Sequence, residues 1–303
     1  TIRTPISSAV TPEADIVEKV APTVSESDVA PVDIIVRRPN FWNFSGSTEL
    51  HLEYNHTTEN WYNGSDKSYS SIWGAVTLRA NYDNKSKFKW NNTLELKLSL
   101  RHVDEDTVHT FKTSEDRIKY TGSIGLQAFK KWYYTFQLIA ETQMFRGFDA
   151  NSDFVNIDFL SPLTVTPSIG MDYNFNWIKN KLNGSVHLAP FASTMKYCDR
   201  KNLSPRYGVE EGKHFNISYG SEININYTFN IVNGIVWQGR IYFYTSYDHC
   251  RLELENNFNF SVNKYLSGRF TVYPRFDDST WRSEDHGYWQ FKEYLTFGLT
   301  YSF

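Results

Sequence analysis

The chain has 303 residues, of which 17 % are aromatic, and its 31 basic and 34 acidic residues give a formal net charge of −3. It has no apolar run long enough for a transmembrane helix, too little positive charge for a nucleic-acid-binding domain, and too few cysteines for a disulfide scaffold or a cysteine-based zinc site. Disordered chains are poor in rings, so a ring-rich sequence with a mean hydropathy of −0.51 favours a transmembrane β-barrel, apolar outside and polar inside.

The first segment, residues 1–40, differs in composition from the rest of the chain. It holds five of the ten prolines and none of the aromatic residues. We expect an extended or flexible periplasmic segment, in which the apolar stretch 34–36 pairs with a strand edge, plugs the barrel mouth, docks a partner or stays disordered. The sequence opens on Thr1 without a charged-then-apolar leader, so we interpret it as a mature chain that has lost a signal peptide.

From residue 41 to 303, apolar and polar residues alternate with a period of two, the pattern of strands with two different faces. The expected strands are longer than the roughly 5–6 residues usual in soluble sheets, and long enough for the roughly 9–11 residues that a tilted strand needs to cross a bilayer. We predict an all-β, closed, antiparallel transmembrane barrel of about 12 strands, with 10 and 14 as alternative counts. The expected strands are 42–54, 70–82, 87–101, 117–128, 132–145, 163–173, 182–195, 214–227, 235–247, 251–262, 265–275 and 288–303.

The expected connections alternate between short and long. Short turns follow at 83–86, 129–131, 228–234 and 263–264, and long polar loops at 55–69, 102–116, 146–162, 196–213 and 276–287. The connections 174–181 and 248–250 fit the alternation less well. Outer-membrane barrels have short periplasmic turns and long extracellular loops, and an even strand count places both termini in the periplasm.

Alternate positions of these strands carry charged side chains that we expect to line the lumen. The candidates are Glu49, Glu53, Arg79, Glu95, Lys97, Arg101, Glu222, Arg240, Arg251, Glu253, Glu255, Arg269 and Arg275. Both signs occur, whereas a charge-selective pore would show one dominant sign. The lumen is therefore expected to be closed by ion pairs, with a narrow solute or ion pore as the alternative.

Aromatic residues lie where strands begin, as interfacial girdles require. They include Phe41, Trp42 and Phe44 at one strand, and Trp289 and Phe291 at another. The last expected strand places four apolar residues on one face up to the final position, which resembles the C-terminal signal that the barrel-assembly machinery recognises in bacterial outer-membrane proteins. These residues are Phe297, Leu299, Tyr301 and Phe303.

The two cysteines fall in loops on the same expected outer rim. In an oxidising envelope Cys198 and Cys250 are candidates for a disulfide, with two free thiols as the alternative. Acidic pairs and clusters in the expected outer loops, at 104–106, 210–211, 277–278 and 284–285, leave a loop-bound calcium ion open, but no EF-hand spacing occurs and no cofactor is expected.

Enzyme chemistry is not indicated by the sequence. His187 shares a strand face with Ser185, and His51 lies between Glu49 and Glu53. Residues two apart on a strand are roughly 6–7 Å from each other, too far for a direct hydrogen bond, so these histidines are interpreted as lumen residues.

Several segments together resemble a family of Bacteroidota outer-membrane β-barrel proteins defined only as a domain of unknown function. They are WNNTLELKL at 90–98, KKWYYT at 130–135, SIGMDY at 168–173, GVEEGKH at 208–214, FDDS at 276–279, EDH at 284–286 and QFKE at 290–293. The resemblance spans about 41–303 and implies a fold and an outer-membrane location, but no activity.

The sequence thus predicts a non-enzymatic outer-membrane barrel with a structural or interaction role, as a subunit of a larger envelope complex. The alternative is a narrow channel for small solutes or ions. Expected partners are outer-membrane lipid, the barrel-assembly machinery and other envelope proteins, with no nucleic acid.

Overall fold

A computed structural model gives the fold of the chain. The structure describes residues 40–58, 68–84, 87–102, 108, 111–149, 151–263, 265–280 and 282–303. The chain divides into two units, Thr1–Asn40 and Phe41–Phe303, and the second makes the barrel. The predictions for residues 1–39 lie outside the described residues.

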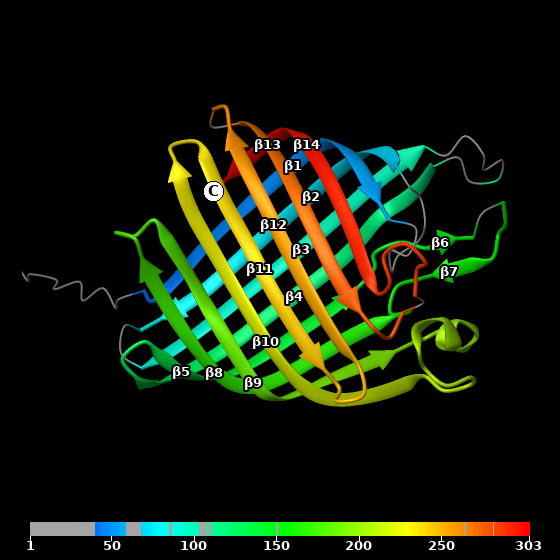
Figure 1. The fold of residues 1–303 in the computed structure, drawn as a ribbon, viewed down its shortest axis with the longest axis horizontal. Coiled ribbons are helices and arrows are strands. Elements are labelled where there is room, and N and C mark those ends of the chain that lie inside the picture. Colours follow the sequence, from blue (N-terminus) through cyan, green and yellow to red (C-terminus); the bar gives the residue numbers. More distant parts are fainter. Residues whose placement is uncertain are drawn as a thin grey trace, which may run out of the picture. The chain divides into compact units, whose positions relative to one another are not determined.

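Long strands make up nearly all of the second unit (Figure 1). The first seven elements are β1 (Trp42–Thr57), β2 (Ser68–Asp83), β3 (Phe88–His102), β4 (Phe111–Phe129), β5 (Trp132–Thr142), β6 (Gly147–Phe148) and β7 (Val155–Ile157). The others are β8 (Leu163–Trp177), β9 (Leu182–Tyr197), the 3-10 helix η2 (Lys201–Tyr207), β10 (Phe215–Val232), β11 (Ile235–Thr245), β12 (Cys250–Ser261), β13 (Leu266–Asp277) and β14 (Trp289–Ser302). In the part of the chain that the structure describes, no helix has the length and apolar character needed to cross a membrane.

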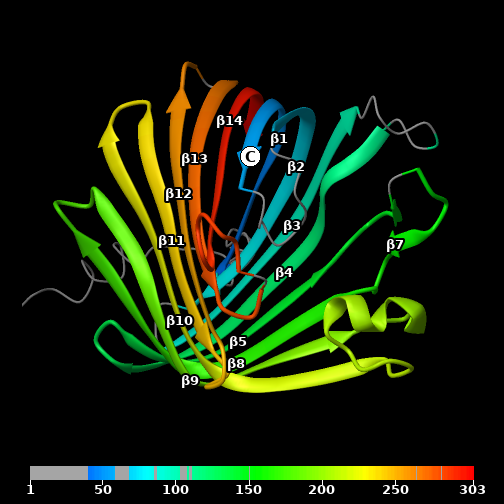
Figure 2. The same ribbon diagram turned by 45° about the vertical axis from the view of Figure 1, so that its right-hand side comes forward.

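Twelve of the strands form one closed antiparallel barrel in the order β1-β14-β13-β12-β11-β10-β9-β8-β5-β4-β3-β2 (Figure 2). Each strand pairs with its neighbour in the chain, except where the small β6–β7 hairpin intervenes between β5 and β8. The first and last strands close the barrel in a continuous register from Ser47 opposite Ser302 to Thr57 opposite Lys292. The predicted closed barrel of 12 strands is confirmed.

The two ends of the barrel differ in their connections. At one end, called the short-turn end, the connections are 84–87, 130–131, 178–181, 233–234 and 262–265, and β1 begins and β14 ends there. At the other, the long-loop end, the connections include 143–162, which contains β6 and β7, and 198–214, which contains η2. The predicted alternation of short and long connections is confirmed, with the short connection 246–249 as the exception at the long-loop end.

Several strand boundaries differ from the sequence-based prediction, among them those of β5, which ends at Thr142, and β10, which runs on to Val232. Strand β4 begins at Phe111 rather than 117, and β8 runs on to Trp177, which shortens the connection that had fitted poorly. The polar residues Asn174 and Asn176 suggested a loop in the sequence. Phe175 and Trp177 alternate with them along the strand, and their rings stack on each other with centroids 4.5 Å apart. These two rings favour continuation of the strand, because aromatic side chains pack well on a pleated surface.

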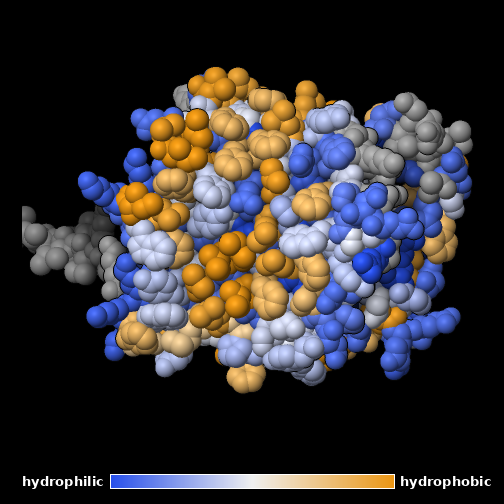
Figure 3. Space-filling view, viewed as in Figure 1, coloured by the Kyte–Doolittle hydropathy of each residue, from blue (hydrophilic) through white to orange (hydrophobic). Residues whose placement is uncertain are grey.

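Alternation along each strand sorts side chains between the two faces of the wall. On β1, Leu50 and Leu52 are 57 % and 67 % exposed on the outside, whereas His51 and Glu53 are buried on the inside. Space-filling shows apolar side chains gathered over the strands and hydrophilic ones toward the long-loop end (Figure 3). The apolar surface thus lies outside the barrel and the polar surface inside, the reverse of a soluble domain.

Aromatic side chains cluster where the strands reach the ends of the barrel. At the short-turn end, Trp42 contacts Tyr82 and Trp90, with ring centroids 5.3 and 5.4 Å apart. At the long-loop end, Trp289 lies 5.5 Å from Phe276. Such rims match the interfacial preference of rings that combine an apolar body with a polar edge.

Candidate functional site in the lumen

The predicted charged residues lie on the inner face of the barrel. Glu53, Glu222, Glu253 and Arg275 are buried there, and most of the others are half-buried, namely Glu49, Glu95, Lys97, Arg101, Arg240, Arg251, Glu255 and Arg269. Arg79, near the short-turn end of β2, is exposed. Most of the predicted charged residues are therefore shielded at least in part from solvent.

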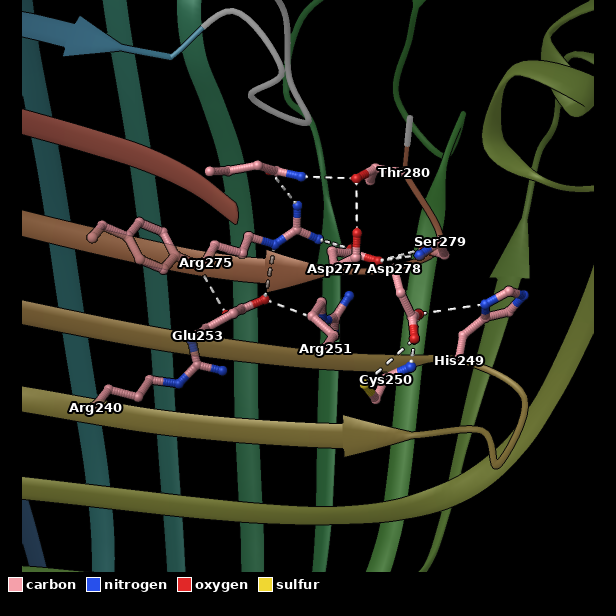
Figure 4. A network of polar contacts seen from close by, with 12 residues as sticks. Arg240, His249, Cys250, Arg251, Glu253, Arg275, Asp277, Asp278, Ser279 and Thr280 are labelled. Carbon is pink, nitrogen blue, oxygen red and sulfur yellow. Dashed lines mark hydrogen bonds and ion pairs between the residues drawn. The ribbon is translucent and has the colours of Figure 1, made fainter. Parts of the chain in front are cut away.

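Glu253 on β12 is the centre of one cluster of charges (Figure 4). Three guanidinium groups approach its carboxylate: Arg240 Nη1 at 3.3 Å, Arg251 Nε at 3.2 Å and Arg275 Nε at 3.7 Å. The Tyr273 hydroxyl also donates a hydrogen bond to Glu253 Oε2 over 2.9 Å. A carboxylate surrounded in this way is compensated for its loss of water.

Arg275 extends this network toward the long-loop end. Its Nη2 donates to Asp277 Oδ2 over 2.5 Å and its Nη1 donates to Gln290 Oε1 over 3.0 Å. Figure 4 shows these contacts between β12 and β13, and beside them the separate contacts of Asp278 with Cys250 and His249.

A second cluster lies on β3 and β4. Lys97 Nζ is 2.6 Å from Glu115 Oε2, and Arg117 Nη2 is 3.7 Å from Glu95 Oε2. The side chains of Glu95 and Arg117 are 36 % and 31 % exposed, so the bore leaves space beside them. Glu115 was not singled out from the sequence because the strand was expected to begin at 117, although charges at 115, 117 and 119 repeat with the strand period.

A third, drier cluster joins β8, β9, β10 and β11. His187 Nδ1 contacts Asp172 Oδ1, and His187 Nε2 lies 3.1 Å from Ser168 Oγ. Ser168 donates to Glu222 Oε1 over 2.7 Å, and the Tyr242 hydroxyl donates to Glu222 Oε2 over 3.1 Å. The partner of His187 is thus Ser168 and not Ser185, because the β8–β9 register sets Asp172 opposite His187.

This cluster contains the residue types of an acyl-transfer triad but not their arrangement. The hydroxyl of a nucleophilic serine donates its hydrogen bond to the histidine. The hydroxyl of Ser168 instead donates its hydrogen bond to Glu222. Ser168 is also 2 % exposed, and a carboxylate beside it opposes the build-up of negative charge that acyl transfer requires. The geometry supports a buried polar network.

Some side chains reach over one or two intervening strands along the inner wall. Arg269 on β13 donates to Glu49 Oε2 on β1 over 3.1 Å, and its guanidinium carbon lies 5.7 Å from the centre of the Trp73 ring on β2. Lys97 Nζ on β3 lies 5.7 Å from the ring centre of Tyr294 on β14. Because β13 and β2, and likewise β3 and β14, are separated by two strands, these side chains project from the wall over their neighbours and narrow the lumen.

A cavity remains at the short-turn end of the lumen. It has a volume of about 400 Å³ and is lined by two residues from each of six consecutive strands in the barrel wall. The lining residues are Phe41, Asn43, Asn81, Asp83, Lys89, Asn91, Ser123, Gly125, Tyr133, Thr135, Asp172 and Asn174.

The predicted disulfide is wrong, since both cysteines are free thiols. Cys198 follows β9 and pairs through its N–H with His214, whereas Cys250 begins β12 and lies opposite Thr245. Three inter-strand steps of about 4.8 Å separate β9 from β12, which is roughly 14 Å in all. This distance is about twice the roughly 7 Å that a disulfide allows between Cα atoms. Cys250 Sγ instead donates to Asp278 Oδ2 over 3.4 Å, and burial raises the pKa of the Cys198 thiol.

Some of the acidic loop residues are paired within the protein, and one segment lies outside the described residues. Residues 104–106 are that segment, Glu210 pairs with Lys213, and Asp278 accepts hydrogen bonds from Cys250 and lies 3.4 Å from His249 Nδ1. Among the residues that the structure describes, no three histidine, cysteine or acidic side chains gather as a metal site.

The loops 143–162 and 198–214 are tied to each other, and we call them the loop platform. Arg200 Nε and Arg146 Nε donate to Asp158 Oδ2 over 2.6 and 3.2 Å, and the Tyr207 hydroxyl donates to the Asn156 carbonyl over 2.7 Å. Partial burial favours the neutral acid, but the Arg200 hydrogen bond outweighs it and holds the pKa of Asp158 below its usual value. Burial raises the pKa of Tyr207 to about 12.

The residues of the proposed C-terminal signal share the outer face of β14. Phe297, Leu299 and Tyr301 are each 58 % exposed, and Phe303 is 62 % exposed. Phe303 also exchanges two backbone hydrogen bonds with Gly46, each 2.9 Å long, and so extends the pairing of β14 with β1. The predicted common face is confirmed.

Comparisons with known proteins give fold-level likeness. Residues 54–148, less than half of the chain, match the model of a family described as a protein of unknown function (DUF3078). A comparison with curated protein sequences finds no match.

Several solved barrels have a similar fold. An outer-membrane channel from Pseudomonas putida F1 aligns at 11 % identity and a TM-score of 0.45, covering 91 % of this chain and 100 % of that one. The NanC porin aligns at 8 % identity and a TM-score of 0.41, covering 82 % and 98 %. An anion-selective porin from Comamonas acidovorans aligns at 9 % identity and a TM-score of 0.35, covering 86 % and 99 %.

Proposed function

We propose that this chain is an integral outer-membrane β-barrel with a structural or interaction role in a larger envelope complex, and that its lumen is held shut by paired side chains that project from its wall. The observation that carries the proposal is the set of contacts between strands that are not neighbours, above all Arg269 with Glu49 and Trp73. The start of β1 and the end of β14 would then both lie in the periplasm, and the loop platform would face the outside of the cell.

The membrane location is supported by the outer surface of the barrel. Large apolar side chains such as Leu50, Leu52 and Phe297 are more than half exposed, which in water would favour aggregation. Strand pairing closes around the whole barrel, which satisfies the backbone groups that lipid cannot bond.

The interaction role is supported by the loop platform. Ion pairs and hydrogen bonds between its two loops fix their relative positions, and Phe145, Phe154 and Phe159 remain about half exposed on the 143–162 loop. A preorganised surface with exposed rings binds a partner at a lower entropy cost than a flexible loop would. Recovery of stoichiometric envelope proteins after purification in mild detergent is expected.

Conductance in planar bilayers tests the closed lumen. The purified wild-type barrel is expected to show no stable open steps, whereas the double change Arg269→Ala and Lys97→Ala removes two bridges and is expected to yield them. The matched control Arg206→Ala, on η2 outside the lumen, is expected to stay closed. Reproducible open steps from the wild-type barrel would contradict the proposal.

A narrow passage for small polar solutes or ions is the second candidate. Its support is the partial exposure of charged lumen residues such as Glu95 and Arg117, beside which the bore leaves space. It predicts small wild-type conductance steps whose size or ion selectivity changes in Glu253→Gln, because Glu253 balances three guanidinium groups.

A further inference from the structure

The cavity at the short-turn end has a lining with an ordered chemical pattern. Asn43 on β1 lies opposite Asn81 on β2, Asn81 lies opposite Asn91 on β3, and Asn91 lies opposite Ser123 on β4. The wall thus presents a row of amide and hydroxyl groups across four neighbouring strands, at intervals of about 4.8 Å. Each amide provides both donors and acceptors.

The charged groups of the cavity are already engaged within the protein. Lys89 Nζ lies 3.5 Å from Asp83 Oδ2 and 4.8 Å from the centre of the Tyr133 ring. Asp172 contacts the buried His187. A charged ligand would have to displace one of these pairs, whereas a neutral ligand would not.

Asn81 offers a polar atom that lacks a partner within the protein. Its Oδ1 is buried and accepts no hydrogen bond. A buried acceptor of this kind costs stability unless water or a ligand satisfies it. It lies in the middle of the row, between Asn43 and Asn91.

The cavity is also lined by two aromatic rings and by one glycine. The rings of Tyr133 and Phe41 line it, and Gly125 contributes no side chain. A Cβ atom at Gly125 would meet Tyr133 Cβ at 3.6 Å, an ordinary contact, so the backbone does not require glycine there. Glycine therefore leaves space in the cavity that a larger side chain would fill.

We propose that this cavity binds a neutral polyhydroxylated ligand, a small saccharide, through the row Asn43–Asn81–Asn91–Ser123 with an aromatic ring against its carbon face. Hydroxyl groups both donate and accept and so match a row of amides, and ring carbons pack against Tyr133. The volume of about 400 Å³ falls in the range of small-molecule sites. The site is independent of whether the bore conducts.

The proposal is tested by measuring the binding of maltose and sucrose to the full chain in detergent. Saturation-transfer NMR and calorimetry are the two measurements. Saturable binding is expected for the wild type at millimolar concentrations or below. Asn81→Leu, which has nearly the same volume but no amide, is expected to weaken it about tenfold. The matched control Asn176→Leu changes an exposed asparagine of the same end of β8 outside the cavity lining, and is expected to bind as the wild type does.

Gly125→Leu locates the site, because the leucine side chain would occupy the cavity and is expected to abolish binding. Heat-modifiable migration on gels establishes whether each variant is folded. If Gly125→Leu does not fold, Asn81→Leu tests the site in its place. The proposal is overturned if folded wild type binds neither sugar, if folded Gly125→Leu binds as well as the wild type, or if lysine or succinate binds in the same cavity more tightly than maltose.

Discussion

Glu222 is only 1 % exposed, so its carboxylate is buried in the barrel interior. Its two oxygens accept hydrogen bonds from Ser168 and Tyr242, and His187 Nε2 lies 3.6 Å from Oε1. These three groups come from three different strands, so the carboxylate joins β8, β9 and β11 to β10. Deleting one member of such a network leaves the others without partners in a place that water does not reach.

Glu222→Ala is therefore expected to destabilise the barrel. Two hydroxyl donors lose their acceptor, and at roughly 1–3 kcal/mol for each unsatisfied group the free energy of unfolding should fall by about 2–6 kcal/mol. Denaturant unfolding in lipid vesicles, followed by tryptophan fluorescence, measures it. The control Glu211→Ala, at an exposed loop position, should stay within about 0.5 kcal/mol. Equal stability of the two variants would mean that the network contributes little.

The alternation in the sequence identified the inner face of strands correctly, but not the contacts made across it. A period of two predicts that Glu222 lines the lumen, and Glu222 is buried on the inside together with Asn224. The pairing of His187 with Ser168 depends on the register between β8 and β9, which local sequence does not encode. The same limit explains the wrong disulfide, because the distance between Cys198 and Cys250 depends on the strands that separate them.

At the scale of elements, the strands were predictable and the long loops were not. A barrel strand repeats every two residues over its whole length, so its pattern exceeds local noise. The β6–β7 hairpin and η2 are short, and are held by contacts from distant residues such as Arg206 with Asp149 over 3.3 Å. The cavity was likewise invisible in the sequence, because asparagines on three strands and a serine on a fourth form a row only after the strands pair.

The loop platform is expected to loosen in acid. The folded pKa of Asp158 is depressed, so its stabilising contribution is fully present above the unfolded value of about 4 and is lost as the pH falls through the folded pKa. Hydrogen-exchange protection of residues 143–162, corrected for intrinsic rates, should drop between pH 6 and pH 3. The partly exposed pair limits the effect to at most about 1 kcal/mol.

Asp158→Asn separates this titration from general effects of acid. The variant should show the looser platform already at pH 6 and little further change at pH 3, because the titrating group is gone. Asp248→Asn, an exposed residue in the β11–β12 connection, should behave as the wild type. Unchanged protection in Asp158→Asn at pH 6 would assign the acid response to another group.

At the scale of the whole molecule, the outer surface determines the solvent in which the barrel is stable. Leu50 lies at the middle of β1, is 57 % exposed, and pairs with Leu299 on one side. If the outer face meets lipid there, Leu50→Arg should lower the free energy of unfolding in phospholipid vesicles by about 2–4 kcal/mol.

Phe154→Arg is the matched control for this prediction. Phe154 is 47 % exposed but lies on the long loop rather than on a barrel strand, so the same new charge should meet water and have little effect. An equal and small effect of both changes would contradict burial of the outer face in a bilayer.

The pairing of β1 with β14 has a consequence for the time course of folding. The residues that close the barrel, such as His51 and Gly298, are separated by nearly the whole barrel sequence, so this contact forms only after a large loss of chain entropy. A Cβ atom at Gly298 would lie 2.1 Å from the Leu50 carbonyl oxygen, so the two strands also need close approach to pair. Until they meet, two apolar strand edges stay unpaired, and slow closure exposes them to aggregation. The rate at which this seam forms should therefore set the yield of refolded barrel.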